Sequence, residues 1–169
     1  MSLTAKENPY KSTILYYQLK NYEKACEIGI KNIDINNEAF LSLVADACAR
    51  DNKIDNLTKI ITFLKSSKKY RENRSYFTTL LLQKSLLLEF MEDDIDISYL
   101  KFPKTPHILS KVFQKIAAKK FKVIENNPKV VEIFIEGKRF TLSTSKRNPY
   151  ILVIKEYMDD ILTKRYRIE

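Results

Sequence analysis

The sequence predicts an α+β protein, with an N-terminal helical bundle domain followed by a small C-terminal β-rich domain. Apolar residues recur at helical spacing up to about residue 100, and runs of β-branched and aromatic residues dominate after residue 118. Between them, the segment Phe102-Pro-Lys-Thr-Pro106 disfavours helix at the residue before each proline. We therefore expect a helical assembly domain in residues 1–100, a basic linker with an amphipathic helix in 101–118, and a β-rich domain in 119–169.

The helical part is expected to contain one helix or a broken pair from Pro9 to Ile30, followed by three further helices. Asn37 is placed to cap a helix over Glu38–Arg50, and later helices are expected over 54–64 and 71–91. Leucines occur around much of the last helix, which predicts that it packs against another subunit as well as its own bundle. The residues expected at this interface are Tyr76, Phe77, Leu80, Leu81, Leu87 and Leu88.

The C-terminal part is expected to form a small sheet. Strands are predicted at 121–125, 131–135, 139–142 and 150–154. The second and third flank Gly137, and a glycine between alternating runs favours a tight hairpin turn. Residues 155–162 have helical spacing and are expected to form a helix, which a short final strand at 166–168 follows.

Several classes of site are excluded by composition. The chain has only two glycines, Gly29 and Gly137, so neither a P-loop nor a dinucleotide-binding loop is expected, and no cofactor is predicted. Its apolar runs are interrupted by polar residues and are too short to span a bilayer. Cys26 and Cys48 lie within helical patterns and no secretory signal precedes them, so we expect reduced core cysteines in an intracellular protein.

Neither a catalytic constellation nor a metal site is predicted, and the protein is interpreted as non-enzymatic. The single histidine, His107, has no second histidine or cysteine near it in sequence and is expected to be a surface or capping residue. The acidic run from Glu92 to Asp96 lacks the pattern of a calcium loop and is expected to be a solvated helix end. Asp159 and Asp160 occupy adjacent positions, which point apart in the helix expected there.

The net positive charge is confined to the C-terminal part. Residues 1–100 carry 14 Lys and Arg against 14 Asp and Glu, whereas residues 101–169 carry 16 against 7 and so account for the net charge of +9. Such a distribution is typical of a protein whose basic part meets nucleic acid or an acidic partner. The candidate binding residues are Lys111, Lys115, Lys119, Lys120, Lys122, Lys138, Arg139, Lys146 and Arg147.

Two other interpretations of these basic residues are possible from the sequence. Charge runs often belong to ordinary solvated faces, and the basic helix over 107–118 could also lie on a membrane surface. This helix is short and contains no tryptophan, which argues against membrane contact.

One short segment resembles a tetratricopeptide repeat. The residues Tyr16-Tyr-Gln-Leu-Lys-Asn-Tyr-Glu-Lys-Ala25 are similar to the junction of such a helical hairpin, and residues 49–57 echo them. The repeats lack the small residues that let tetratricopeptide hairpins nest, and nothing continues the pattern after Leu64. This resemblance implies a short protein-interaction module.

A second resemblance covers most of the chain. A helical domain ending in a leucine-rich helix that follows Arg71-Glu-Asn-Arg74, then a proline-bearing linker and a small β module, resembles a GINS replication complex subunit of the archaeal type with the helical domain first. The order of strands, closing helix 155–162 and final strand is similar to that family's β domain. The sequence departs from the family pattern in lacking glycine at Arg147-Asn148 and at Lys164-Arg165.

Membership of this family implies a non-catalytic scaffold in DNA replication. It implies assembly with other GINS-type subunits in a tetramer, and contacts that bridge or stabilise the replicative MCM helicase and a RecJ-like partner. DNA contact and a cytoplasmic, nucleoid-associated location are further expectations. The alternative class is a stand-alone basic nucleic-acid-binding protein that uses the lysines given above.

Overall fold

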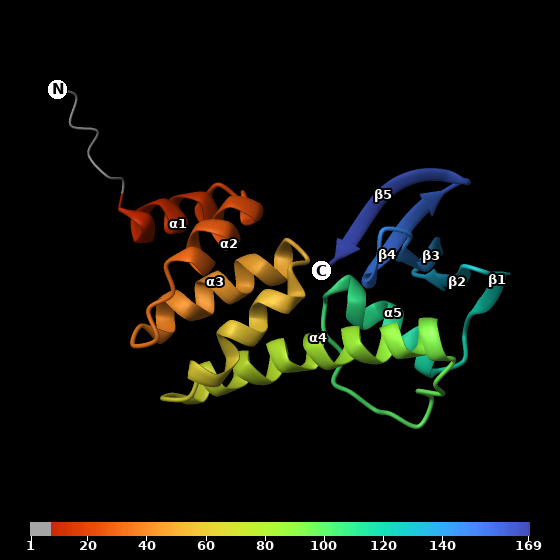
Figure 1. Ribbon diagram of the computed structural model, residues 1–169, viewed down its shortest axis with the longest axis horizontal. Helices are drawn as coiled ribbons and strands as arrows, with labels where there is room; N and C mark the ends of the chain where they lie inside the picture. The colour runs from red at the N-terminus through yellow and green to blue at the C-terminus, as the bar shows by residue number, and fades with distance from the viewer. Residues whose placement is uncertain (1–7) are drawn as a thin grey trace. The chain divides into compact units, whose positions relative to one another are not determined.

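The computed structural model describes residues 8–169 and has the α+β architecture predicted from the sequence, with helices first and an antiparallel sheet at the C-terminus (Figure 1). The helical elements are α1 (Pro9–Gln18), α2 (Tyr22–Lys31), α3 (Glu38–Arg50), the 3-10 helices η1 (Ile54–Lys59) and η2 (Ile61–Phe63), α4 (Lys68–Asp93) and α5 (Ile108–Ala117). The strands are β1 (Lys122–Asn126), β2 (Lys129–Ile135), β3 (Lys138–Ser145), β4 (Asn148–Met158) and β5 (Ile161–Ile168).

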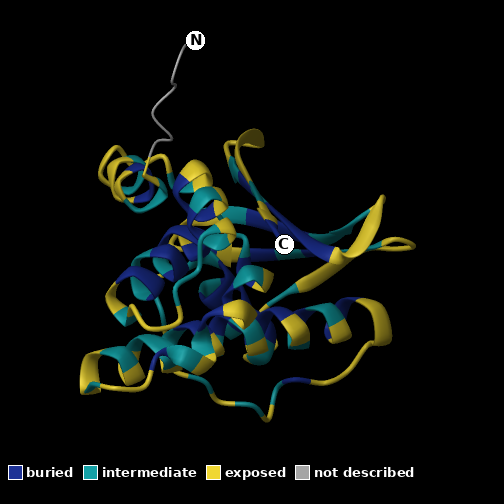
Figure 2. Ribbon diagram, turned by 60° about the vertical axis from the view of Figure 1, so that its left-hand side comes forward, coloured by how far each residue is buried: buried dark blue, intermediate teal, exposed yellow. Residues whose placement is uncertain are grey.

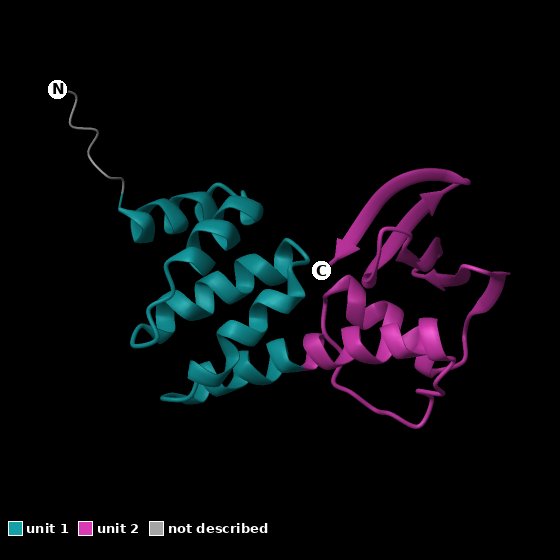
Figure 3. Cartoon of the chain, in the orientation of Figure 1, with its two compact units in different colours: residues 1–78 teal, residues 79–169 magenta. Residues whose placement is uncertain are grey.

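The chain divides into two compact units within α4, between Thr78 and Thr79 (Figure 3). The sequence placed the boundary at about residue 100, after this helix. The long helix instead begins in the first unit and ends in the second, so its leucine-rich part belongs to the same unit as α5 and the sheet.

Asparagine side chains cap the N-termini of the first three helices, α1, α2 and α3. The Oδ1 atoms of Asn8, Asn21 and Asn37 accept hydrogen bonds from backbone N–H groups in the first turns of α1, α2 and α3. An unpaired amide at a helix start needs such an acceptor, and asparagine is among the residues best suited to supply it. The predicted cap at Asn37 is therefore confirmed, and the predicted helix from Pro9 to Ile30 is a pair broken at 19–21.

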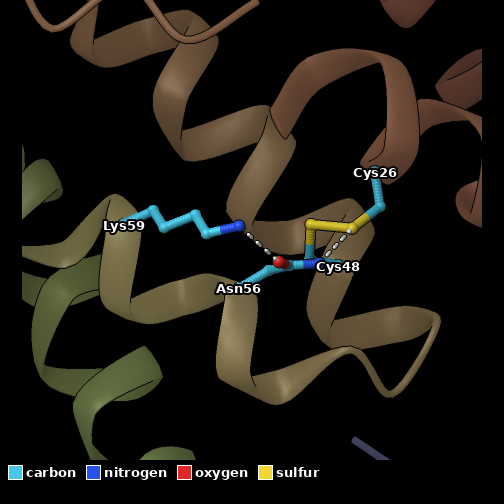
Figure 4. The surroundings of a disulfide bond; sticks show 4 residues. All are labelled: Cys26, Cys48, Asn56 and Lys59. Atoms are coloured by element: carbon cyan, nitrogen blue, oxygen red, sulfur yellow. Dashed lines mark hydrogen bonds between the residues drawn. A yellow bond between two sulfur atoms is a disulfide. The ribbon is translucent and has the colours of Figure 1, made fainter. Parts of the chain in front are cut away.

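Close packing of α2 against α3 brings the two cysteines together. A Cβ added to Gly29 would lie 2.8 Å from Val44 Cγ1 and closer still to Cγ2, so only glycine permits this approach. One turn away the Cα atoms of Cys26 and Cys48 are 4.7 Å apart and the side chains form a disulfide (Figure 4). The expectation of reduced cysteines is wrong, because helical periodicity shows that both residues face inward but does not show that they face each other.

The segment expected as a helix over 54–64 consists of the two 3-10 helices η1 and η2. Its apolar residues Ile54, Leu57, Ile60 and Leu64 are fully buried, as their spacing predicts. Nested tetratricopeptide hairpins require an α-helix at this position, so the structure does not support that interpretation of the first 65 residues.

Leucines of α4 are less available to a partner than the sequence suggests. Leu80 and Leu87 are fully buried within this chain, and Phe77 is 2% exposed, so these three side chains offer almost no surface to another subunit. Tyr76, Leu81 and Leu88 are partly exposed. A contact of α4 with a second chain stays a prediction, and it could use only these partly exposed residues of the expected set.

The sheet of the second unit is a five-stranded antiparallel meander in the order β1-β2-β3-β4-β5. Alternate residues of the central strands form one buried face, and α5 contacts β2. The apolar side of α5 is buried as its spacing predicts. The buried set comprises Val131, Ile133, Ile135, Phe140, Leu142, Leu152 and Ile154 of the sheet and Leu109, Val112, Phe113 and Ile116 of α5.

Two turns of this sheet have left-handed backbone. Glu136 and Gly137 join β2 to β3 with φ of 52° and 80°, which confirms the predicted glycine hairpin. Asp159 and Asp160 join β4 to β5 with φ of 49° and 63°. Aspartate tolerates this conformation better than most residues, so the pair ends β4 and reverses the chain.

The helix expected over 155–162 is therefore wrong. The structure places these residues at the end of β4, in the turn and at the start of β5, with Lys155 opposite Arg165 and Glu156 opposite Lys164. The spacing of a few apolar residues over one short segment does not distinguish the period of a helix from that of a strand. Pairing with β3 makes residues up to Tyr157 extended. The GINS resemblance loses one of its matching elements as a result.

Among residues 8–169, no helix combines the length and the apolar content that crossing a membrane requires.

Candidate nucleic-acid interface

The residues considered as catalytic or metal-binding candidates have structural roles. His107 is the N-cap of α5, and its Nδ1 accepts a hydrogen bond from the backbone N–H of Leu109 at 3.2 Å, as expected for a capping histidine. Within the described part of the chain, no group of three His, Cys, Asp or Glu side chains could hold a metal ion. The acidic run after α4 binds lysines: Asp94 pairs with Lys129 and Asp96 with Lys119.

Asp96 illustrates how these acids are held. Its carboxylate accepts a hydrogen bond from the backbone N–H of Ser98 at 2.8 Å, and this bond, together with Lys119, lowers the pKa of Asp96 to about 2. The carboxylate is mostly exposed and stays ionised at neutral pH. Asp96 therefore fixes the segment after α4 and neutralises one of the predicted binding lysines.

The nine basic residues predicted as a binding surface do not form one surface. Four are engaged by acids of the same unit: Lys111 by Glu136, Lys119 by Asp96, Lys138 by Glu156, and Arg139 by Glu132 and Asp160. The Lys111–Glu136 and Lys119–Asp96 pairs are exposed and contribute little to stability, but all of these pairs lower the charge that is available to a ligand. The other five separate into Lys115 in α5 with Lys120 just after it, Lys122 on the edge strand β1, and Lys146 with Arg147 in the β3–β4 turn.

Lys146 and Arg147 lie at a hollow over the face of the sheet opposite to its buried apolar residues. The hollow has a volume of about 740 Å³, and strands β1 to β5 all contribute to its lining. Its lining includes Thr141, Ser143 and Val153 of β3 and β4, Ile124 of β1, and Pro128 of the β1–β2 turn. The middles of β3 and β4 are buried, whereas β1 and most of β5 are exposed along their length, and Figure 2 shows exposed positions at the hairpin ends.

The strand register explains why basic residues gather here. Successive residues of a strand point to opposite faces, so Lys155 and Tyr157 of β4 lie on the same side as Arg165 and Arg167 of β5. Thr141, Lys155 and Arg165 are direct neighbours across β3, β4 and β5. With Arg139, Lys146 and Arg147, six basic side chains line the hollow, against one acidic residue, Glu125. We call this set the basic sheet face.

Most of this charge is free to meet a ligand. In the described part of the chain, no hydrogen bond or ion pair engages the side chains of Lys146, Arg147, Lys155 or Arg165. Arg139 is held by Glu132 and Asp160 with its guanidinium 4.2 Å from the ring centroid of Tyr157, and Arg167 pairs with Glu169. The basic sheet face thus combines four unpaired cations with an oriented aromatic ring and several hydroxyl groups.

Sequence reasoning missed Lys155, Tyr157, Arg165 and Arg167. Lys155 and Tyr157 fell within the helix expected over 155–162, where a two-residue spacing is not considered, and Arg165 and Arg167 fell just after it, with Arg167 in the expected final strand. The available signal was the alternation Lys155-x-Tyr157 and Arg165-x-Arg167 on either side of Asp159-Asp160, which is typical of a hairpin.

A polar cluster in the first unit has a structural role. The Tyr17 hydroxyl and the Arg50 guanidinium both bind Oδ2 of Asp46, and Arg50 lies over the ring of Tyr22. Burial and the hydrogen bond to Asp46 raise the pKa of Tyr17 to about 12, so its hydroxyl stays protonated at neutral pH and donates to the carboxylate. The cluster links α1 and α2 to α3.

Comparison with models of known protein families, with characterised proteins and with solved structures identifies no match.

Proposed function

We propose that the protein binds single-stranded nucleic acid on the basic sheet face. The observation that carries this proposal is the set of four cationic side chains without partners, Lys146, Arg147, Lys155 and Arg165, around one hollow of the sheet. Phosphate groups are the ligands that such a cluster of lysine and arginine attracts most strongly. Hydroxyl groups of Thr141 and Ser143 in the same hollow supply further donors for phosphate or sugar oxygens.

The chemistry and dimensions of the face favour a single strand over other anions. Its cations lie on β3, β4, β5 and the β3–β4 turn, and neighbouring strands are about 5 Å apart, so the cations fit a chain of phosphates better than one small anion. The ring of Tyr157 lies among them and can stack on an unpaired base, which a duplex does not offer. Sheets with basic and aromatic side chains on an open face are a common platform for single strands.

This function predicts a specific change in salt dependence. For a single strand, each lost phosphate contact reduces the slope of log K against log salt by about 0.7, so Lys155→Gln with Arg165→Gln should reduce it by about 1.4. The measurement is fluorescence anisotropy of labelled oligo(dT) with the full chain at a series of salt concentrations. A duplex of the same length should bind more weakly.

The matched control removes the same charge elsewhere in the second unit. Lys115→Gln in α5 with Lys120→Gln just after it should leave the slope unchanged. Equal reductions of the salt slope by both double variants would show that the oligonucleotide is attracted by the net charge of the protein and not by the basic sheet face. Tyr157→Leu should weaken binding without changing the slope, since stacking releases no counterions.

A second candidate is the scaffold role that the GINS resemblance implies, with GINS-type subunits, the MCM helicase, a RecJ-like protein and DNA as partners at an intracellular, nucleoid-associated location. The order of a helical unit and a sheet unit supports it, as do Ile14, Leu15 and Leu19 of α1, which are 41%, 49% and 66% exposed. The disulfide limits this candidate, because disulfides inside cells are rare outside hyperthermophiles.

The scaffold candidate predicts that Leu81→Glu with Leu88→Glu abolishes co-purification of other subunits from the native cell extract. Both side chains are only partly buried, so the variant should keep its circular dichroism spectrum and its melting temperature to within a few degrees. Light scattering of the purified chain measures its oligomeric state as a second test. A wild-type chain that is a stable monomer without co-purifying subunits would contradict this candidate and leave the nucleic-acid proposal intact.

A further inference from the structure

A second surface hollow lies beside α5, and its chemistry differs from that of the basic sheet face. It has a volume of about 740 Å³ and is formed by the segment 98–104, one side of α5 and the β2–β3 turn. Its apolar lining consists of Leu100, Phe102, Phe113, Ala117, Ala118 and Ile135. Phe113 is 1% and Ile135 is 5% exposed, and the Phe102 ring lies edge-on to Phe113 with centroids 5.4 Å apart. We call this hollow the α5 groove.

Lysines surround this apolar surface. Lys101 and Lys104 lie on the segment before α5, Lys111 and Lys115 lie within α5, and Lys120 follows it. The one acidic residue of the lining, Glu136, pairs with Lys111 at 2.8 Å. In the part of the chain that the structure describes, the side chains of the other four lysines have no hydrogen-bonded or ionic partner.

We propose that the α5 groove binds an acidic amphipathic peptide segment of a partner protein. Apolar side chains of the segment would cover Leu100 and Phe102, while its carboxylates meet the surrounding lysines. Charge complementarity selects this partner: an acidic chain gains from four unpaired ammonium groups, whereas a basic or neutral segment would leave them unpaired. Amphipathic segments commonly bind in apolar grooves through residues spaced three or four apart.

The geometry argues against the other anionic occupants. A nucleic acid backbone would use the lysines but would gain little from a lining of leucine, phenylalanine and isoleucine. A membrane surface needs protruding apolar side chains, and those of this groove are recessed, with Phe113 and Ile135 almost fully buried. The acidic segment of this chain after α4 is already engaged, through Asp94 with Lys129 and Asp96 with Lys119.

The test uses three labelled peptides of about fifteen residues with the full chain. A groove-bound helix typically presents apolar residues at i, i+3, i+4 and i+7, and the peptides differ in whether they have this spacing and in their charge. The first carries Leu and Phe at those positions with Glu and Asp elsewhere. The second has the same composition in an order that spreads the apolar residues around the helix. The third replaces every acid of the first with Gln or Asn. Anisotropy should show the first peptide binding at least about tenfold more tightly than the other two.

Two variants of the groove address its two parts. Lys104→Glu with Lys115→Glu reverses two charges, and Phe102→Ala removes apolar surface from a loop position. Each should weaken binding of the first peptide by about tenfold, the charge reversal mainly by slowing association. Lys155→Gln with Arg165→Gln, on the basic sheet face, should leave peptide binding unchanged. These variants separate the inference from the nucleic-acid proposal, because each surface has its own ligand and its own variants.

Protection of lysines provides a measurement that does not depend on folding of a variant. Acetylation of the wild-type chain followed by mass spectrometry should show Lys104 and Lys115 protected by the first peptide and Lys146 not protected. Equal binding of the first two peptides, binding that the groove variants do not change, or no binding of the first peptide would each overturn the proposal. Sedimentation that shows a dimer dissociated by Lys104→Glu with Lys115→Glu would also overturn it, because the occupant would be a second copy of this chain.

Discussion

Reduction of the Cys26–Cys48 disulfide is expected to lower the free energy of unfolding of the first unit by about 3 kcal/mol. The two cysteines are 22 residues apart, and without the bond the unfolded chain regains the conformational entropy that closure of this loop removes. The bond joins α2 to α3, and Asn56 donates a hydrogen bond to Cys26 Sγ from the next element of the unit. Urea denaturation with and without a reducing agent measures the effect.

The variant Cys26→Ala with Cys48→Ala serves as the control, since it should unfold at the lower urea concentration whether or not reducing agent is present. Hydrogen exchange should show that peptides from α2 and α3 lose protection, while those from β2 to β5 do not. The reduced sample is verified by counting its free thiols. Identical urea curves for this reduced protein and for the oxidised protein would contradict the prediction.

Replacement of Gly29 by alanine is expected to destabilise the first unit by about 1–3 kcal/mol, although alanine favours a helix by about 1 kcal/mol. The added Cβ would overlap Val44, which is fully buried between α2 and α3 and cannot move aside without displacing a helix. Overpacking therefore outweighs helix propensity. Thermal or urea denaturation of Gly29→Ala measures the sign as well as the size.

A double-mutant cycle identifies the cause. Val44→Ala removes the two methyl groups that the new Cβ would meet, so Gly29→Ala should cost much less in that background. Gly137→Ala is the matched control: its Cβ meets nothing within 4 Å, and its cost arises from a φ of 80°. Val44→Ala should not change that cost, and a stabilising Gly29→Ala would contradict the packing argument.

Local patterns predict those elements that are stabilised by local interactions. Asn37 binds a backbone N–H three residues away, and Glu136-Gly137 reverses the chain through its own left-handed backbone, so both were visible in the sequence. The apolar side of α5 was equally clear from its spacing. Each of these features depends on residues that are close together in the chain.

The terminal hairpin and the disulfide depend on residues that are far apart. Residues 155–162 have an ambiguous spacing, and only the pairing of β4 with β3 makes them extended. Cys26 and Cys48 both lie on inward faces, but their meeting depends on how closely α2 approaches α3 at Gly29. Likewise, charge counting located the basic part of the chain but could not show that Lys111, Lys119, Lys138 and Arg139 are paired with acids.

By itself, the sequence determined an α+β protein with helices first, the Asn37 helix cap, the glycine hairpin and the location of the net positive charge, because periodicity, capping and composition act over a few residues. Only the tertiary structure decided which basic side chains share a surface. The sheet register placed Lys155 beside Arg165, and the packing of α5 on β2 set lysines around an apolar groove. Contacts of that kind arise from the pairing of distant segments, which no local pattern encodes.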